Sequence, residues 1–292
     1  MRRITVTGLL ATLLPAALLA APAAATQGID VVADGIVGIA VEPVGTTLVP
    51  GVGANRTIRL VVTMPETWRL DAVAGNSEVP FLLQVDNGTL FQHAFGGDTS
   101  SSVNPAAFDF FPSLQWDSFV TIGSLDSTGA PYLSNNMSEI GVNWDEFNTS
   151  SSINMSNGGW WVIPTEQQGE QAAFADTCGR TRQGVCIAQL TLLGDNATVS
   201  FKALLQGKDE YGVAWQAHIS ISQTTMDDRS TADVLQGCVC DLNTDDRVDV
   251  SDLLDMLSNW SDVPCMDFNV DSAVNAIDLT ELLGAWGPCS TD

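Results

Sequence analysis

Two acidic segments near the C-terminus carry oxygen-bearing side chains at a spacing that suits a metal ion. When residues 241–260 are shifted by 26 positions they align with residues 267–286, and eight of the twenty aligned residues are identical. Repetition this close indicates two copies of one supersecondary unit. In each copy Asp or Asn occupies positions 1, 3, 5, 9 and 12 of a twelve-residue loop, the spacing by which a chain surrounds Ca²⁺.

The chemistry of such a loop is that of a hard cation. Ca²⁺ takes six to eight oxygen ligands at about 2.3–2.6 Å, and alternate residues of a tight loop point inward to supply them. Position 7 adds a backbone carbonyl, here from Arg247 or Ala273. The alternative is a pair of acidic, solvated helix starts that bind no metal. Repulsion among the five carboxylates of the first loop would then be uncompensated.

Each loop is followed by a segment with helical periodicity. The apolar residues that recur on one helix face are Leu253, Leu257 and Trp260 in the first copy and Leu279, Leu283 and Trp286 in the second. The apolar residue at position 8, Val248 or Val274, turns away from the ligands and anchors the loop on a small core. The pattern therefore predicts a loop and a helix, followed by a second loop and helix.

These residues resemble the dockerin module, a paired calcium loop and helix whose partner in cellulosomes is the cohesin domain. Cysteines flank each repeat, and the ending Trp-Gly-Pro-Cys (286–289) is similar to dockerin-type repeats at the C-termini of many secreted planctomycete proteins. The resemblance implies two Ca²⁺ sites and a cohesin-like or other cell-surface protein as partner. It implies as ligands of the first ion Asp241, Asn243, Asp245, the Arg247 carbonyl, Asp249 and Asp252. It implies as ligands of the second ion Asp267, Asn269, Asp271, the Ala273 carbonyl, Asn275 and Asp278.

The repeat departs from the dockerin pattern at two places. Position 6, usually Gly because the chain turns sharply there, is Asp246 in the first loop and Ser272 in the second. A left-handed conformation at a non-Gly residue costs on the order of 1 kcal/mol, which predicts weaker calcium binding. Positions 10 and 11 are Val-Ser (250–251) and Ala-Ile (276–277) rather than the Ser-Thr-like pair of clostridial dockerins. A clostridial cohesin is therefore not the expected partner.

The N-terminus indicates a secreted or cell-surface protein. Arg2 and Arg3 precede an apolar run that ends in small residues at 23–25, as in a signal peptide cleaved after Ala25. No later segment is apolar enough to span a membrane. Outside the cell disulfides persist, which favours a pair between Cys178 and Cys186. Three pairings stay open among the C-terminal cysteines, which are Cys238, Cys240, Cys265 and Cys289.

The net charge of the chain excludes some classes of binding partner. The chain has 292 residues and a net charge of −24, so phosphate backbones and anionic lipid surfaces would repel it. Nucleic acid is therefore not an expected partner. With His93 and His218 as the only histidines, sites that need several imidazoles are excluded. Residues 232–292 contain thirteen acidic residues and one basic residue, which concentrates half of the net charge near the predicted calcium loops.

The large segment that precedes the repeats is predicted to form a β domain. Short β-branched or aromatic runs alternate there with Gly, Asn, Ser and Pro, without a helical period between them. The runs are residues 57–64, 80–85, 118–122, 160–163, 186–193, 198–205 and 212–221, and residues 135–157 are expected to form a surface loop. Residues 89–123 resemble an uncharacterised β domain of secreted planctomycete proteins.

The predicted fold is mainly β: an antiparallel β-sandwich followed by a small α-helical, dockerin-like module with two calcium loops. The expected organisation is a signal peptide at 1–25, the sandwich at 26–222, a linker at 223–237 and the calcium-binding repeats at 238–292.

Three functions remain open for the sandwich. The first is a non-catalytic secreted domain attached to its partner through the calcium-dependent module. The second is a polysaccharide-degrading enzyme or carbohydrate-binding subunit in polysaccharide catabolism, and the third is a structural cell-surface protein.

No catalytic residue can be assigned from the sequence, because its acids occur singly, as at Asp98, Asp109, Asp117, Asp145 and Glu146. His93 is expected in a loop or at the surface. Most tryptophans are expected in the core, with one of Trp160 and Trp161 facing outward, where a flat ring could stack on a sugar.

Overall fold

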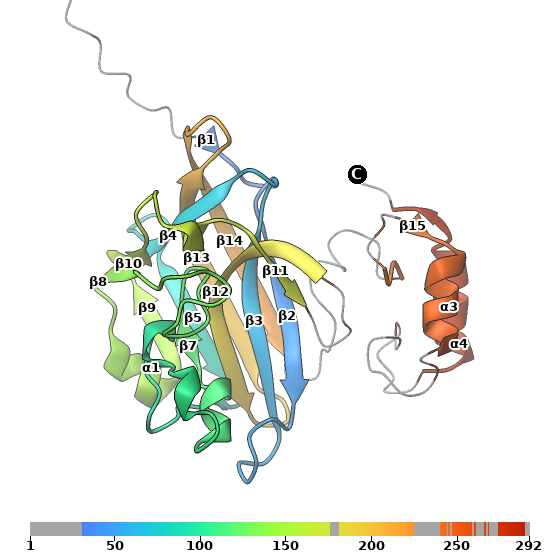
Figure 1. Cartoon of the computed structure of the whole chain (residues 1–292), viewed down its shortest axis with the longest axis horizontal. Helices are drawn as coiled ribbons and strands as arrows, with labels where there is room; N and C mark the ends of the chain where they lie inside the picture. Colours follow the sequence, from blue (N-terminus) through green and yellow to red (C-terminus); the bar gives the residue numbers. More distant parts are fainter. Residues whose placement is uncertain are drawn as a thin grey trace, which may run out of the picture.

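The computed structural model describes residues 31–175, 181–224, 240–243, 245, 247–258, 260, 266, 268 and 274–289 (Figure 1). It is mainly β, and its strand pairs are antiparallel except for the pairing of β1 with β14. The expectation of a β-rich, antiparallel fold is confirmed. No helix in the described part of the chain is long and apolar enough to cross a membrane.

The first sheet has eight strands and follows the order β1-β14-β13-β4-β10-β8, with β5 paired to β13 and β9 paired to β5. Its strands are β1 (Val31–Val32), β4 (Arg69–Gly75), β5 (Phe81–Asp86), β8 (Ser138–Ile140), β9 (Ser152–Met155), β10 (Gly158–Trp161), β13 (Thr198–Lys208) and β14 (Ala214–Thr224). Strand β13 is long enough to pair with β5 along its first half and with β4 along its second half.

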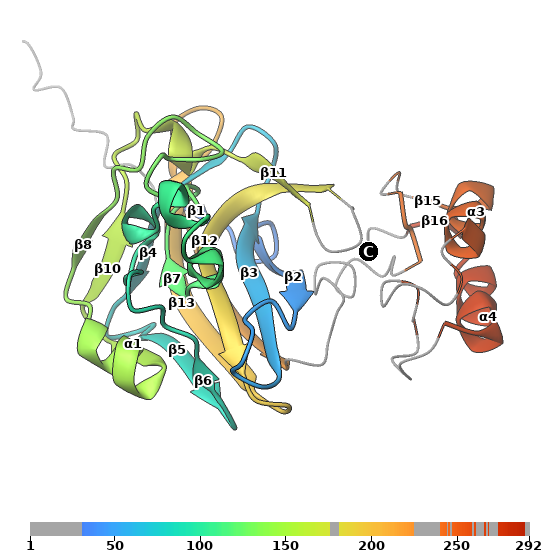
Figure 2. The same ribbon diagram turned by 60° about the horizontal axis from the view of Figure 1, so that its bottom comes forward.

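The second sheet has six strands in the order β11-β12-β3-β2, and β6 and β7 also pair with β12. Its strands are β2 (Gly38–Thr46), β3 (Asn55–Thr63), β6 (Thr89–Leu90), β7 (Phe119–Val120), β11 (Ala172–Ala175) and β12 (Thr181–Leu193). Figure 2 shows the two sheets as separate layers. Every run predicted as a strand contains or overlaps one of these strands.

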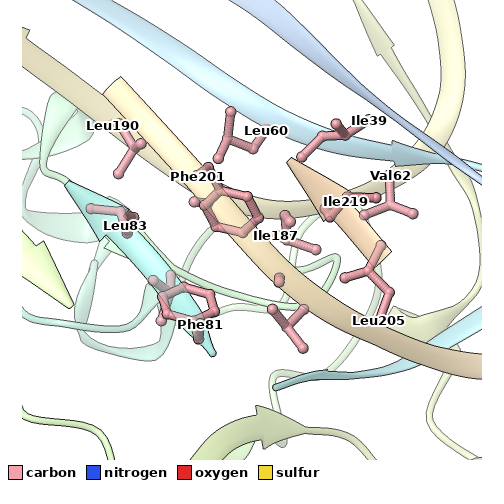
Figure 3. Close-up of a cluster of buried hydrophobic side chains, with 14 of the residues drawn as sticks. Ile39, Leu60, Val62, Phe81, Leu83, Ile187, Leu190, Phe201, Leu205 and Ile219 are labelled. Atoms are coloured by element: carbon pink, nitrogen blue, oxygen red, sulfur yellow. The ribbon is translucent and has the colours of Figure 1, made fainter. Parts of the chain in front are cut away.

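One hydrophobic core lies between the layers. Leu60 of β3 and Ile187 of β12 face Phe81 of β5 and Phe201 of β13 (Figure 3), and these side chains are almost wholly buried. Strand β5 shows why these residues form a sheet, because its buried and less buried residues alternate along its length. Such alternation places apolar side chains on the face that the other layer covers.

Segment 135–157 differs from its prediction as a surface loop. It contains β8, β9 and the helix α1 (Trp144–Ser150), which Asn143 caps by accepting a hydrogen bond from the Glu146 amide. Phe147 and Ile153 are fully buried in the core. The apolar residues of this segment are few and widely spaced among polar ones. Their spacing therefore shows neither a strand nor a helix period, although the fold buries some of them. Short 3₁₀ helices occupy residues 100–102, 105–107, 112–116 and 167–169.

The predicted Cys178–Cys186 disulfide is wrong, because Cys186 is a free cysteine. Its side chain is fully buried on β12, and this burial raises the pKa of the thiol to about 11. A buried thiol of this kind is a packing residue rather than a reactive one. Cys178, Cys238 and Cys265 lie outside the described residues, as do the signal peptide and residues 225–237 of the predicted linker.

Among the described residues of the C-terminal region, the elements are two helices and a short strand pair. They are β15 (Arg247–Val248), α3 (Val250–Ser258), α4 (Ala276–Gly284) and β16 (Gly287–Pro288). Figures 1 and 2 both show α3 and α4 side by side. Each helix begins at position 10 of its repeat, so the predicted helices are confirmed.

Candidate functional site: the repeated acidic loops

The last carboxylate of the first loop ties the loop to the start of α3. Asp252 is fully buried, and its Oδ1 accepts a hydrogen bond of 2.7 Å from the amide of Leu242. Its Oδ2 accepts another of 2.7 Å from the amide of Asp249. The side chain at position 12 therefore holds positions 2 and 9 of the loop together.

The second loop repeats this arrangement at residues 26 positions later. Asp278 is also fully buried, and its Oδ1 accepts from the Phe268 amide at 2.7 Å. Its Oδ2 accepts from the Asn275 amide at 2.8 Å, while the Asn275 side chain caps α4 by accepting from the Ile277 amide. The sequence repeat is thus also a repeat in hydrogen bonding.

The other oxygen-bearing side chains of the first loop bind the amides that follow them. The Asp245 amide donates to Asp241 Oδ1 at 3.2 Å and to Asn243 Oδ1 at 3.1 Å. The Arg247 amide in turn donates to Asp245 Oδ1 at 3.0 Å. Asp and Asn side chains that accept from an amide two residues on turn the chain tightly. Positions 1, 3 and 5 therefore have the local geometry of a compact loop.

The oxygen-bearing side chains at the predicted ligand positions are all carboxylates or carboxamides, the groups that a hard cation such as Ca²⁺ prefers. The only basic residue of the first loop, Arg247, is exposed. Within the residues that the structure describes, no three His, Cys, Asp or Glu side chains are grouped closely enough to hold a metal ion. Asp267, Asn269, Asp271 and Ala273 of the second predicted set lie outside those residues, as do Asp246 and Ser272 at position 6.

A small core lies under the loops and helices. Val248, at position 8 of the first loop, is almost fully buried with Met256 of α3 and Leu282 of α4. Val274, its equivalent in the second loop, packs against the same core. The predicted anchoring role of position 8 is confirmed. Cys289, directly after β16, is disulfide-bonded.

Both helices also expose apolar side chains. Val250, Leu254 and Leu257 follow one another at intervals of four and three residues on α3, and each is at least half exposed. Two exposed pairs obey the 26-residue repeat, and these are Leu257 with Leu283 and Trp260 with Trp286. A helix that carries apolar residues on both its buried and its exposed side can form a second interface.

In the β domain, Asp117 is a buried acid with a raised pKa. Its carboxylate is fully buried and accepts hydrogen bonds from the amides of His93 at 2.6 Å and Gly97 at 3.0 Å. Burial raises the pKa of this carboxyl from 3.8 to about 6, although the two amides act to lower it. Gly96 has no room for a side chain, because a Cβ there would lie 1.7 Å from Asp117 Oδ2. Asp117 therefore organises the loop around it and faces no open site.

The aromatic predictions for the β domain are confirmed. His93 lies in a loop, with its ring about 6 Å from those of Phe91, Phe95 and Phe111. Trp160 is fully buried in the core, whereas Trp161 on the same strand is only partly buried. Trp215 is buried, and Trp68 and Trp144 pack against the core, while Trp116 is partly exposed.

No family model, curated protein or solved structure matches this chain. Function must therefore be inferred from the chain's own residues and geometry.

Proposed function

We propose that residues 238–292 form a calcium-dependent, dockerin-type docking module that attaches a secreted, non-catalytic β-sandwich protein to a cohesin-like or other cell-surface protein. The observation that carries the proposal is the repeated buried carboxylate, because Asp252 and Asp278 make the same two backbone hydrogen bonds 26 residues apart. Two loops with one local design and oxygen ligands at the same positions favour two equivalent cation sites.

The residues that would hold calcium differ in how firmly they are placed. Asp252 and Asp278 are fixed by their hydrogen bonds to the backbone. Asp241 is almost fully buried and lies in sequence between Cys240 and Leu242, which belong to the small core. Asp245 and Asn243 are exposed, and their side-chain oxygens accept amide hydrogen bonds within the loop. Bound Ca²⁺ would supply the positive charge that offsets the carboxylates of the loop. Binding would then draw positions 1, 3 and 5 toward the fixed carboxylate at position 12.

The docking role is supported by the apolar side chains outside the small core. A soluble module of this size would bury Leu257, Trp260, Leu283 and Trp286 if its own core had room for them, yet each is exposed by more than a third. Exposed apolar residues that gather on one small unit mark a binding surface. Because the loops fix where the helices begin, calcium binding and partner binding would be coupled.

The test is capture of a partner from the source organism's envelope and secretome by the chain from residue 26 to 292, with calcium or with chelator. We expect capture with calcium only. Asp252→Asn and Asp278→Asn together should abolish it, whereas Glu281→Gln, an exposed residue of α4, removes a charge without touching a proposed ligand. Capture that survives the double substitution would contradict the proposal.

A second set of variants separates docking from calcium binding. Leu257→Ser with Leu283→Ser removes exposed apolar area and leaves every proposed ligand intact. We expect this variant to bind calcium as the parent chain does and to lose partner capture. If it captures as well as the parent chain, the partner is held by another surface.

A further inference from the structure

The outer face of the eight-stranded sheet carries a hollow that the proposed docking function does not use. The hollow has a volume of about 400 Å³ and lies over β13, β4 and β10. Leu205, Val73 and Trp160 are register partners on these strands, and all three point into the core. Because side chains alternate along a strand, their neighbours on each strand point outward and line the hollow.

Two cross-strand rows form the hollow. In one row Gln206 of β13 lies opposite Ala72 of β4, which lies opposite Trp161 of β10. In the other row Leu204 lies opposite Ala74, and Ala74 lies opposite Gly159. The middle of each row is an alanine, and the second row continues from Ala74 to Gly159, so the floor is low at the centre of the hollow.

The floor cannot be filled by a larger residue at Gly159. A Cβ at that position would lie 2.4 Å from the carbonyl oxygen of Val73 and 2.9 Å from the Cβ of Ala74. Beyond the glycine, Ile140 on the edge strand β8 is 66% exposed. The hollow is therefore bounded by Trp161 and Ile140 on one side and by Leu204 and Gln206 on the other.

The hollow is neutral in an otherwise strongly acidic chain. No Asp, Glu, Lys, Arg or His lines it, although the net charge of the chain is −24. Its polar side chains are carboxamides, from Asn76, Asn157 and Gln206, which both donate and accept hydrogen bonds. An aromatic ring with a few uncharged polar groups suits a ligand that has apolar faces and many hydroxyl groups. Nothing in this lining would compensate an ionic ligand.

A second hollow continues along the same face. It has a volume of about 340 Å³ and is lined by residues that include Ser200 and Lys202 of β13 and Ser220 of β14. Lys202 lies two residues before Leu204, so the two hollows follow one another along β13. Lys202 is the one charged side chain that lines this second hollow, and a single cation does not offset the repulsion of an anionic glycan by a chain of net charge −24. Two adjoining hollows fit an extended chain better than a single small molecule.

We infer that this face binds an uncharged polysaccharide chain, with a sugar ring against Trp161 and its hydroxyl groups bonded to Gln206 and Asn157. This inference goes beyond the proposed docking function and stands on separate residues. It predicts that binding of the glycan persists in chelator, whereas partner capture by the C-terminal module does not. The failure of one can therefore be distinguished from the failure of the other.

The test is retention of the chain from residue 26 to 292 in native gels that contain soluble β-glucan, xylan or mannan, with alginate and pectate as anionic glycans. We expect retention by at least one uncharged glycan and none by the anionic ones. Trp161→Ala should weaken the affinity by roughly tenfold or more, as loss of a central aromatic contact does. Ala74→Leu should weaken it comparably by raising the floor while the ring remains.

Trp116→Ala is the matched control, because Trp116 is also partly exposed but does not line the hollow. It should leave retention unchanged, and thermal unfolding of each variant shows whether the fold is intact. Should Trp161→Ala fail to fold, Ala74→Leu and Gln206→Ala decide the question. The inference is overturned if the parent chain binds no uncharged glycan, if retention survives these substitutions, or if the anionic glycans bind equally well.

Discussion

The β domain and the C-terminal repeats are built on different sources of stability. In the β domain, two sheets enclose a continuous core. Within it, Phe81 packs edge to face against both Trp160 and Phe201. In the repeats, the described core is a single small cluster, and two buried carboxylates hold the loops by backbone hydrogen bonds. A small core rarely supplies enough stability alone, so such units usually need disulfides or a metal.

The contrast has a consequence for how each region responds to its surroundings. Burial of apolar area does not depend on an ion, whereas a loop rich in carboxylates is stabilised by the cation that it binds. We therefore expect the β domain to be indifferent to calcium and the repeats to depend on it.

Removal of calcium should unfold the repeats and leave the β domain intact. We expect amide exchange in α3 and α4 to accelerate by roughly a thousandfold, because ligands held at about 1,000 times their Kd contribute about 4 kcal/mol. Amides of β12 and β13 should exchange at unchanged rates. Hydrogen exchange of the chain from residue 26 to 292, with disulfides reduced and with calcium or chelator, measures both regions in one sample.

Two results would contradict this difference between the β domain and the repeats. Equal protection of α3 and α4 in both buffers would mean that the loops need no metal. Loss of protection in β12 or β13 on adding chelator would mean that the β domain itself depends on the ion. The oxidised chain is the control, since its crosslinks constrain the unfolded state and should preserve part of the order.

Truncation of a central core residue should affect only the β domain. Phe201→Ala should lower its free energy of unfolding by about 3–5 kcal/mol, because Phe201 is almost fully buried and packs edge to face on Phe81. The exposed Phe110, changed to Ala, is the matched control and should cost under about 0.5 kcal/mol. Urea unfolding followed by tryptophan fluorescence measures both. A shift in calcium affinity of the Phe201 variant would contradict the independence of the two regions.

The sequence was informative where a local period coincides with burial. The long strands β3, β12 and β13 were predicted because β-branched and aromatic residues run through them, and the helices α3 and α4 because the repeat carries Leu at helical spacing. Strand β2 was missed, because Glu42 and Pro43 interrupt its apolar residues, although Glu42 is buried. Strand β2 forms because it pairs with β3. No local sequence pattern reveals that pairing.

The candidate sites show the same limit. The proposed oxygen ligands of the first loop follow from spacing within twelve residues, so the sequence alone is enough to propose them. The hollow beside Trp161 joins residues that are more than 130 positions apart, such as Ala72 and Gln206, and only strand register brings them together. Likewise, Asp117 was one of several scattered acids until the fold placed the His93 and Gly97 amides against it.

The pH response of the β domain should be set in part by Asp117. Its pKa is raised to about 6 in the folded chain, so the folded state binds this proton more tightly than the unfolded state does. The stabilising contribution is therefore complete below the unfolded value of 3.8 and is lost as the pH rises through about 6. Relative to Asp117→Asn, which cannot ionise, we expect the parent chain to lose about 2–3 kcal/mol between pH 4 and pH 7.

Urea unfolding of the two chains across this pH range tests the expectation. Repulsion from the other acids acts on both chains and cancels in the difference. The asparagine also gives up one acceptor of an amide hydrogen bond, but that cost is the same at every pH. A constant difference between the two chains would show that Asp117 does not titrate differently on folding.

Position 6 of the second proposed calcium loop should have the smallest effect; it is Ser272, which takes the place of glycine and lies outside the described residues. A sharp turn at this position needs a positive φ, which costs a non-Gly residue on the order of 1 kcal/mol. Ser272→Gly should therefore tighten the second site by roughly fivefold in titration calorimetry. Asp246→Gly is a poorer test, because it also removes a negative charge from the first loop.

Ser251→Gly is the matched control, because it makes the same substitution in the first turn of α3, where the helical backbone needs no positive φ. A glycine there disfavours the helix by about 0.5 kcal/mol relative to serine, so the first site should bind calcium no better and somewhat more weakly. Opposite responses of the two serines would locate the cost in the turn of the loop itself. An unchanged or weaker second site after Ser272→Gly would show that this loop does not make the turn, and the two repeats would then differ in how they hold the ion.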